Sequence, residues 1–192
     1  MHPTVYKQFE KILQKYEVNG KVLEVGAVPN KRSLLASITL GGGCEKVGIN
    51  LVGSKKISDF KIVEGNANNM DMFKNQTFDC VLCNAVLEHD KYFWKSVFEM
   101  KRVLKKGGLL IIGTPSYTNL RFNRITIFIT GRNPISDFLR NVTFCFRIHD
   151  APGDYYRFSE QTFKEVFFAG FKNVTIKTIM LPPRTIGYGF KK

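Results

Sequence analysis

The sequence of 192 residues lacks any apolar run near the roughly 20 residues that span a bilayer. Its first residues, Met-His-Pro-Thr-Val-Tyr-Lys, lack the basic-then-apolar pattern of a secretory signal peptide. A cytoplasmic protein is therefore expected. No repeat, low-complexity tract or Pro/Ser-rich linker divides the chain, so we expect one domain over 1–192, with a lid or insertion at about 116–150.

Cysteine is scarce, with four residues in all. Cys80 and Cys83 form a C-x-x-C pair, but no second Cys/His pair stands at zinc-finger spacing. In a strand, positions i and i+3 face opposite sides, so the two thiols would point apart. We therefore predict buried, reduced cysteines and no metal site.

Acidic residues are few in the second half of the chain. The net charge is +13 overall, with +2 over residues 1–100 and +11 over residues 101–192. Such an asymmetry can mark a surface for nucleic acid, an anionic membrane or a phosphorylated substrate. An ordinary solvated basic surface explains it equally well, and both interpretations stay open.

Helical and strand patterns alternate along the chain. Helical spacing of apolar residues predicts helices over 4–17, 33–40 and about 93–104, and Ser159 is expected to cap a further helix. Short apolar runs predict strands over 21–25, 46–50, 61–64, 78–83, 109–113, 174–180 and 186–190. This alternation predicts an α/β domain with a parallel sheet, whose last two strands form an antiparallel pair at one edge.

The segment 78–115 carries most of the functional information. It contains FDCVLCNAVLEH (78–89), a helical stretch and RVLKKGGLLIIGTP (102–115), which together predict strand, loop, helix, glycine turn and strand. Ligands of doubly wound sheets bind at the carboxyl ends of the strands, so residues 84–89 are predicted to line a crevice. No G-x-G-x-x-G accompanies the segment, which argues against a dinucleotide enzyme.

This segment, with VLEVGA (22–27) and LEH (87–89), resembles the class I S-adenosylmethionine (SAM)-dependent methyltransferases, in particular small members of the LEH type. The resemblance implies a Rossmann-like, doubly wound, mostly parallel seven-stranded sheet with an inserted helical lid. It also implies methyltransferase activity with S-adenosyl-L-methionine as the cofactor.

The resemblance assigns cofactor-binding positions to the loops after the first four main strands. Two departures stand out, because Asn50 and Asn66 occupy places where the family often has an acid, and Val28 replaces a second glycine. An amide loses the charge-assisted hydrogen bond of a carboxylate, so altered SAM affinity is expected. Alternatively the two asparagines are only turn residues. The implied cofactor-binding residues are Glu24, Gly26, Ala27, Asn50, Leu51, Asn66, Ala67 and Asn84.

Two histidines are candidate general bases for an acceptor that must lose a proton, namely His89 and His149. The arginine-rich segment 116–150 and the cluster HDAPGDYYRFS (149–159) predict an acceptor pocket. Because guanidinium groups bind phosphate and carboxylate, we expect a small, anionic acceptor such as a sugar, lipid-linked precursor or metabolite. The candidate substrate-binding residues are Arg121, Arg147, Tyr155, Tyr156 and Arg157.

Two other functions remain as alternatives. The basic second half suits an RNA- or DNA-directed methyltransferase, although Cys83-Asn84-Ala85-Val86 stands where an N-P-P-Y-type tetrapeptide is found in such enzymes. The changes at Val28, Asn50 and Asn66 suit a degenerate, non-catalytic binding protein with the same fold.

Overall fold

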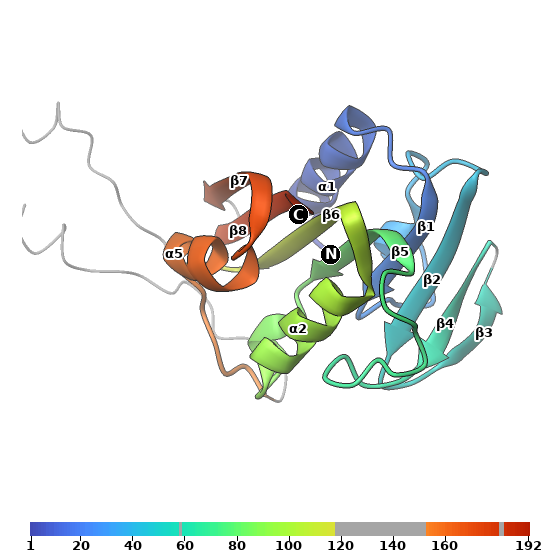
Figure 1. Ribbon diagram of the computed structural model, residues 1–192. Coiled ribbons are helices and arrows are strands. Elements are labelled where there is room, and N and C mark those ends of the chain that lie inside the picture. The colour runs from blue at the N-terminus through green and yellow to red at the C-terminus, as the bar shows by residue number, and fades with distance from the viewer. Residues whose placement is uncertain (58, 118–152, 181–182) are drawn as a thin grey trace, which may run out of the picture.

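The computed structural model describes residues 1–57, 59–117, 153–180 and 183–192 (Figure 1). All but the first two residues of the predicted lid at about 116–150 lie outside these ranges. The candidates Arg121, Arg147 and His149 lie outside them as well. Within the described ranges, no helix is long and apolar enough to cross a membrane.

The core of the fold is one twisted sheet. Its strands are β1 (Gly20–Val25), β2 (Cys44–Asn50), β3 (Ser54–Ile57), β4 (Phe60–Glu64), β5 (Phe78–Asn84), β6 (Leu104–Pro115), β7 (Phe171–Met180) and β8 (Pro183–Lys191). They are ordered β3-β4-β2-β1-β5-β6-β8-β7. The five strands from β4 to β6 are parallel, whereas β8 and β7 form an antiparallel pair at one edge. The expected doubly wound, mostly parallel α/β sheet is therefore confirmed, and β3 is a short antiparallel edge strand that the sequence did not predict.

Helices cover both faces of this sheet (Figure 1). They are α1 (Pro3–Lys15), α2 (Phe93–Val103) and α5 (Glu160–Thr162), with short helical turns η1 (Leu34–Ala36), η2 (Leu87–His89) and η3 (Phe163–Phe167). Helix α1 packs into one hydrophobic core with η1, and α2 packs into a second core with η3. Residues two apart on a strand share a face, which is why each central strand supplies both cores.

The cysteine pair on β5 illustrates this alternation. Cys80 lies in the core under α1, and Cys83 lies in the core under α2. Both thiols are free and buried, as predicted, and burial raises the pKa of each.

The prediction of a helix over 33–40 is wrong, because only the turn η1 forms there. The Ser33 hydroxyl and the Leu35 N–H both donate to the Glu24 carboxylate, and the Ser37 hydroxyl donates to Glu10 at 2.8 Å. Serine side chains that bond locally or to a neighbouring carboxylate favour turns over a continued helix. The predicted cap at Ser159 is confirmed, since its hydroxyl accepts from the Thr162 N–H at 3.2 Å.

Candidate functional site

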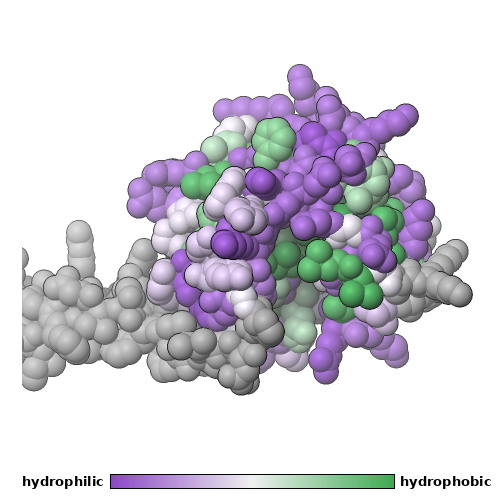
Figure 2. Space-filling view, turned by 90° about the horizontal axis from the view of Figure 1, so that it is seen from below, coloured by the Kyte–Doolittle hydropathy of each residue, from purple (hydrophilic) through white to green (hydrophobic). Residues whose placement is uncertain are grey.

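A pocket of about 440 Å³ opens at the carboxyl ends of β1, β2, β4 and β5. This is the edge where open α/β sheets bind ligands. Figure 2 views this side of the molecule and shows a hollow with hydrophobic side chains gathered beside it. The lining residues are Val25, Gly26, Ile49, Asn50, Leu51, Gly65, Asn66, Ala67, Asn68, Ala85, Val86, His89, Asp90, Lys91, Tyr92 and Tyr155.

Gly26 begins the pocket where β1 ends. Its φ of +79° lies in the left-handed region, and its N–H donates to the Ile49 carbonyl at 2.8 Å. A Cβ at this position would come within 2.3 Å of Cγ2 of Val86 across the pocket. Only glycine suits both the conformation and the space, so the first loop passes close to the loop after β5.

Asn50 ends β2 and ties the first loop in place. Its Nδ2 donates to the Ala27 carbonyl at 2.8 Å, and its Oδ1 accepts from the Leu51 N–H at 2.7 Å. A carboxylate has no donor and could not make the bond to Ala27. The asparagine therefore replaces the family's acid with a residue that also anchors a loop lacking its second glycine.

Asn66 and Asn68 form the wall after β4. The Asn66 Oδ1 accepts from the Asn68 N–H at 2.9 Å, as in a turn stabilised by an asparagine side chain. The Asn68 Nδ2 donates to Asp90 at 2.6 Å and to the Ser96 hydroxyl at 2.8 Å. Because Asp90 precedes α2, these bonds join the loop after β4 to the loop after β5 across the pocket.

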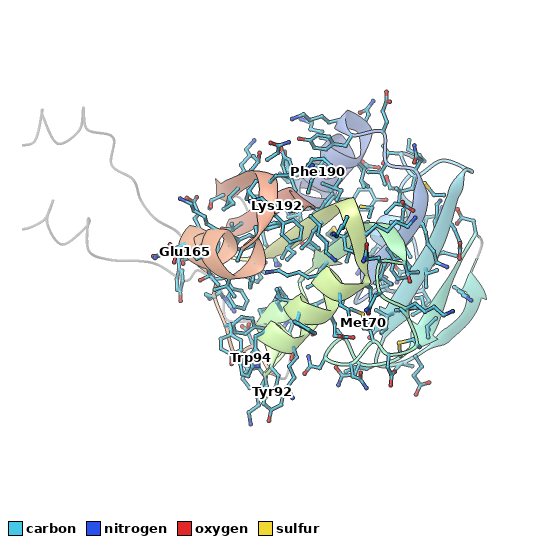
Figure 3. All side chains as sticks on the ribbon, viewed as in Figure 1. Met70, Tyr92, Trp94, Glu165, Phe190 and Lys192 are labelled. Carbon is cyan, nitrogen blue, oxygen red and sulfur yellow. The ribbon has the colours of Figure 1, made fainter. Side chains whose placement is uncertain are left out.

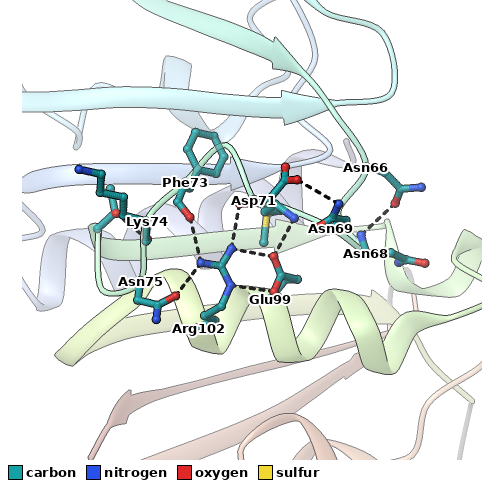
Figure 4. A network of polar contacts seen from close by, with 11 residues as sticks. Asn66, Asn68, Asn69, Asp71, Phe73, Lys74, Asn75, Glu99 and Arg102 are labelled. Atoms are coloured by element: carbon teal, nitrogen blue, oxygen red, sulfur yellow. Dashed lines mark hydrogen bonds and ion pairs between the residues drawn. The ribbon is translucent and has the colours of Figure 1, made fainter.

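An ion pair behind the pocket holds the same loop on α2 (Figure 4). The Arg102 guanidinium contacts both carboxylate oxygens of Glu99 at 2.8 Å and also donates to the carbonyls of Met70 and Phe73. Glu99 in turn accepts from the Met70 N–H at 2.7 Å. The arginine lowers the pKa of Glu99, so its carboxylate stays charged and the network persists near neutral pH.

The loop after β5 contains a second buried acid. The side chain of Glu88 is 0% exposed, and its nearest cation is the Arg184 guanidinium on β8 at 3.5 Å. Its Oε2 has no hydrogen-bond partner among the described residues. Burial raises the pKa of Glu88 from 4.5 to about 7, while Arg184 and Arg157 pull that pKa down. A carboxyl group that titrates near neutral pH beside a pocket is typical of functional sites.

Glu88 also fixes the pocket wall through its backbone. Its carbonyl accepts from the Tyr155 N–H at 2.8 Å and from the Tyr156 N–H at 3.3 Å. The Tyr155 side chain lines the pocket beside His89. Segment 153–159, distant in sequence, is therefore attached directly to the LEH turn.

The structure brings about half of the sequence-predicted site residues together at this pocket. Glu24 and Ala27 are buried outside it, and Asn84 directs its Oδ1 toward Gly113 on β6. The predicted residues that line the pocket are Gly26, Asn50, Leu51, Asn66, Ala67, His89 and Tyr155.

Two candidate substrate residues are engaged within the protein instead. Arg157 forms a bidentate ion pair with Asp154, whose Oδ2 lies 2.5 Å from its Nη2. The Tyr156 ring packs on Phe93 and Phe158, and its hydroxyl donates to the Lys91 carbonyl at 3.0 Å. The Tyr156 side chain holds segment 153–159 against the loop after β5, and the Arg157 ion pair joins residues within that segment.

The sequence did not predict several of the residues that line the pocket. Asn68, Asp90, Lys91 and Tyr92 belong to no motif, so only their positions could have indicated them. Asn68 lies two residues after Asn66, and the other three directly follow LEH. An extension of each predicted loop by three residues would have included all four.

Comparisons with known proteins match part of the sequence and the whole of the fold. Residues 44–112 match the family model described as a methyltransferase domain. The uncharacterised protein MJ1123 of Methanocaldococcus jannaschii is 30% identical over 109 residues, which are 57% of this chain and 51% of that protein. The chain thus spans about half the length, or less, of the curated relatives it matches.

Solved structures share the fold at low identity. A SAM-dependent methyltransferase from Archaeoglobus fulgidus superposes with a TM-score of 0.66 at 12% identity, covering 98% of this chain and 93% of that one. The 1,6-didemethyltoxoflavin-N1-methyltransferase of Burkholderia thailandensis gives 0.67 at 16% identity, covering 98% and 78%.

The sheet order and the pocket at its carboxyl edge define a doubly wound α/β domain with its pocket where such folds bind ligands. Residues 44–112 match a methyltransferase domain, and the fold is shared with a solved SAM-dependent methyltransferase. The predicted fold is therefore confirmed, and the domain match agrees with the predicted family over that part of the chain.

Proposed function

We propose that this protein transfers a methyl group from SAM to a small, anionic acceptor. The pocket at the ends of β1, β2, β4 and β5 carries the proposal. Its volume lies within the range of small-molecule sites. Its apolar walls and its asparagine side chains suit a ligand with a flat ring and several polar groups.

The residues present fit this cofactor. Gly26 leaves room where the first loop meets Val86, and the side chains of Leu51 and Ala67 offer apolar surface. In the proposed arrangement Asn50 and Asn66 face the nucleoside, although both already make hydrogen bonds within the protein. We therefore expect SAM to bind, with an affinity that depends on the anchored loops more than on a charged side chain.

When bound, SAM would supply a methyl group on a positively charged sulfur. An electron pair of the acceptor would form the new bond to the methyl carbon, and the C–S bond would break, so that the sulfur leaves as the neutral thioether of S-adenosylhomocysteine. The protein has to align the acceptor with that methyl carbon and exclude water, because proximity provides most of the rate. His89 lines the pocket and is the proposed base for an acceptor that loses a proton.

The excess of basic residues and the position of Lys91 in the pocket wall support an anionic acceptor. Small acceptors are also consistent with the toxoflavin precursor that the Burkholderia enzyme is named for.

A matched pair of glycine substitutions tests the cofactor site. Gly26→Ala should lower SAM affinity at least about tenfold, because it strains the backbone and collides with Val86. Gly42→Ala should leave the affinity unchanged, since a Cβ there meets nothing within 4 Å. Calorimetric titration with SAM and with S-adenosylhomocysteine measures both, and thermal unfolding reports whether each variant is folded. Absence of binding heat in the wild type, or equal affinity in both variants, would contradict the proposal.

A further inference from the structure

An exposed aromatic patch adjoins the mouth of the pocket. It consists of Tyr92, Trp94 and Phe98, whose side chains are 44%, 50% and 67% exposed. Trp94 and Phe98 stand four residues apart and share the outer face of α2. The rings of Tyr92 and Trp94 meet edge to face at 5.7 Å, and Figure 3 shows the two side chains together at the start of that helix. Tyr92 belongs to both the patch and the pocket.

The charge around this patch is positive. Lys91 and Lys95 are exposed and lie 5.8 Å and 5.1 Å from the Tyr92 ring centroid. The adjacent acids are engaged within the protein, because Asp90 accepts from Asn68, Ser96 and the Tyr92 N–H. Glu99 is paired with Arg102 on the buried side of the helix. The surface therefore offers aromatic rings and ammonium groups without a competing carboxylate from this helix.

This combination of aromatic rings and lysines matches the chemistry of an anionic membrane surface. Tryptophan and tyrosine rings are favoured at the boundary between lipid headgroups and acyl chains. Lysines beside them are attracted to anionic headgroups. We infer that this patch docks the protein on an anionic membrane, with the mouth of the pocket turned toward the lipid. We further infer that the acceptor is carried by a lipid, and this step rests on the proposed function.

The only tryptophan in the chain reports docking directly. Trp94 fluorescence should shift to shorter wavelength when vesicles containing phosphatidylglycerol are added, and should stay unchanged with phosphatidylcholine alone. A flat signal with both vesicles, or an equal shift with both, would overturn the inference. SAM is absent from this measurement, so it succeeds or fails independently of the cofactor site.

Two sets of variants locate the contact by vesicle flotation. Trp94→Ala with Phe98→Ala should reduce binding at least about tenfold, because the apolar area that enters the membrane is removed. Ile38→Ala removes another exposed apolar side chain, 91% exposed and outside the patch, and should have no effect. Equal binding by all three proteins would overturn the inference.

The charge contribution has its own matched control. Lys91→Glu with Lys95→Glu should weaken binding about tenfold or more. Lys11→Glu with Lys15→Glu makes the same charge change at the same spacing on α1 and should weaken it much less. Equal losses of vesicle binding in the two double variants would show that only the total charge matters, and would overturn the inference of a local contact. A lipid-free dimer that the Trp94 and Phe98 substitutions dissociate would also overturn it, because the patch would then bind a second copy.

Discussion

Two buried glutamates stand at the carboxyl ends of neighbouring strands, and their surroundings differ. Glu24, near the end of β1, is bonded to the Ser33 hydroxyl and to the Leu35 N–H. Glu88, after β5, has a distant arginine at 3.5 Å and an oxygen without a partner among the described residues. Burial raises the pKa of both. Because buried polar groups are normally satisfied, the incomplete hydrogen bonding of Glu88 distinguishes it from Glu24.

The same contrast separates the pocket wall at β1, β2 and β4 from the buried region at β5 and β6. Around β1, β2 and β4, the polar side chains of Asn50, Asn66 and Asn68 are occupied by hydrogen bonds that fix loops. Around β5 and β6, buried oxygens of Asn84, Glu88 and Thr114 lack partners among the described residues. The asparagine side chains that line the pocket are thus fixed by internal hydrogen bonds, whereas the buried oxygens at β5 and β6 are not.

The largest effect is expected from Glu24→Ala. The substitution leaves the buried Ser33 hydroxyl without its acceptor and removes one of the two acceptors of the Leu35 N–H, which should cost about 2–4 kcal/mol of stability. Urea unfolding measures the loss. A loss of stability below about 1 kcal/mol would show that the hydrogen bonds of Glu24 contribute little, and would contradict the distinction between Glu24 and Glu88.

Glu88→Gln should change how stability depends on pH. The folded-state pKa of Glu88 is raised from 4.5 to about 7, so the native state holds a proton that the unfolded state has lost between these values. Stability should therefore fall as pH rises through this window, by up to about 3 kcal/mol. Above about pH 7, Glu88 is ionised in both states, so the loss of stability is complete. The glutamine variant should lack this component, as urea unfolding across pH 4 to 8 would show.

The charges that face Glu88 are Arg184 on β8, with Arg157 and Asp154 from segment 153–159. All three remain in the glutamine variant, so the difference from the wild type isolates Glu88 itself. Identical pH slopes in both proteins would mean that Glu88 titrates at its ordinary value.

The smallest effect is expected at a cross-strand threonine pair. Thr114 on β6 stands opposite Thr185 on β8, and both are fully buried. Thr114→Val should change stability by less than about 1 kcal/mol, since its hydroxyl has no partner among the described residues. Thr185→Val should cost about 1–2 kcal/mol, because its hydroxyl bonds to those of Ser116 and Thr178. Equal losses in thermal unfolding would contradict the distinction between satisfied and unsatisfied oxygens.

Strong periodic patterns predicted the fold well. The helices at 4–17 and 93–104 and the seven predicted strands lie within a few residues of their observed positions. The helix over 33–40 failed because Glu24 competes for the polar groups at its start. Such a contact joins residues about ten apart and cannot be inferred from local spacing.

The site was predictable only in part. The resemblance implied Gly26, Asn50 and Asn66, and these residues do line the pocket because the carboxyl ends of parallel strands meet at one edge. The roles of Arg184 and Asn68 could not be found in this way. Arg184 is nearly one hundred residues from Glu88, and the two meet only after β8 inserts between β6 and β7.

The sequence by itself determined the α/β class, the mostly parallel sheet and the antiparallel pair at its edge, because these follow from periodicity, turn residues and the handedness of crossovers. The tertiary structure alone decided which polar atoms are used. Glu24 lies near the end of one apolar strand segment, and Glu88 comes shortly after another. Whether a buried oxygen meets a donor depends on what the folded chain brings beside it, and that sets which of the two acids is fully hydrogen-bonded and which is not.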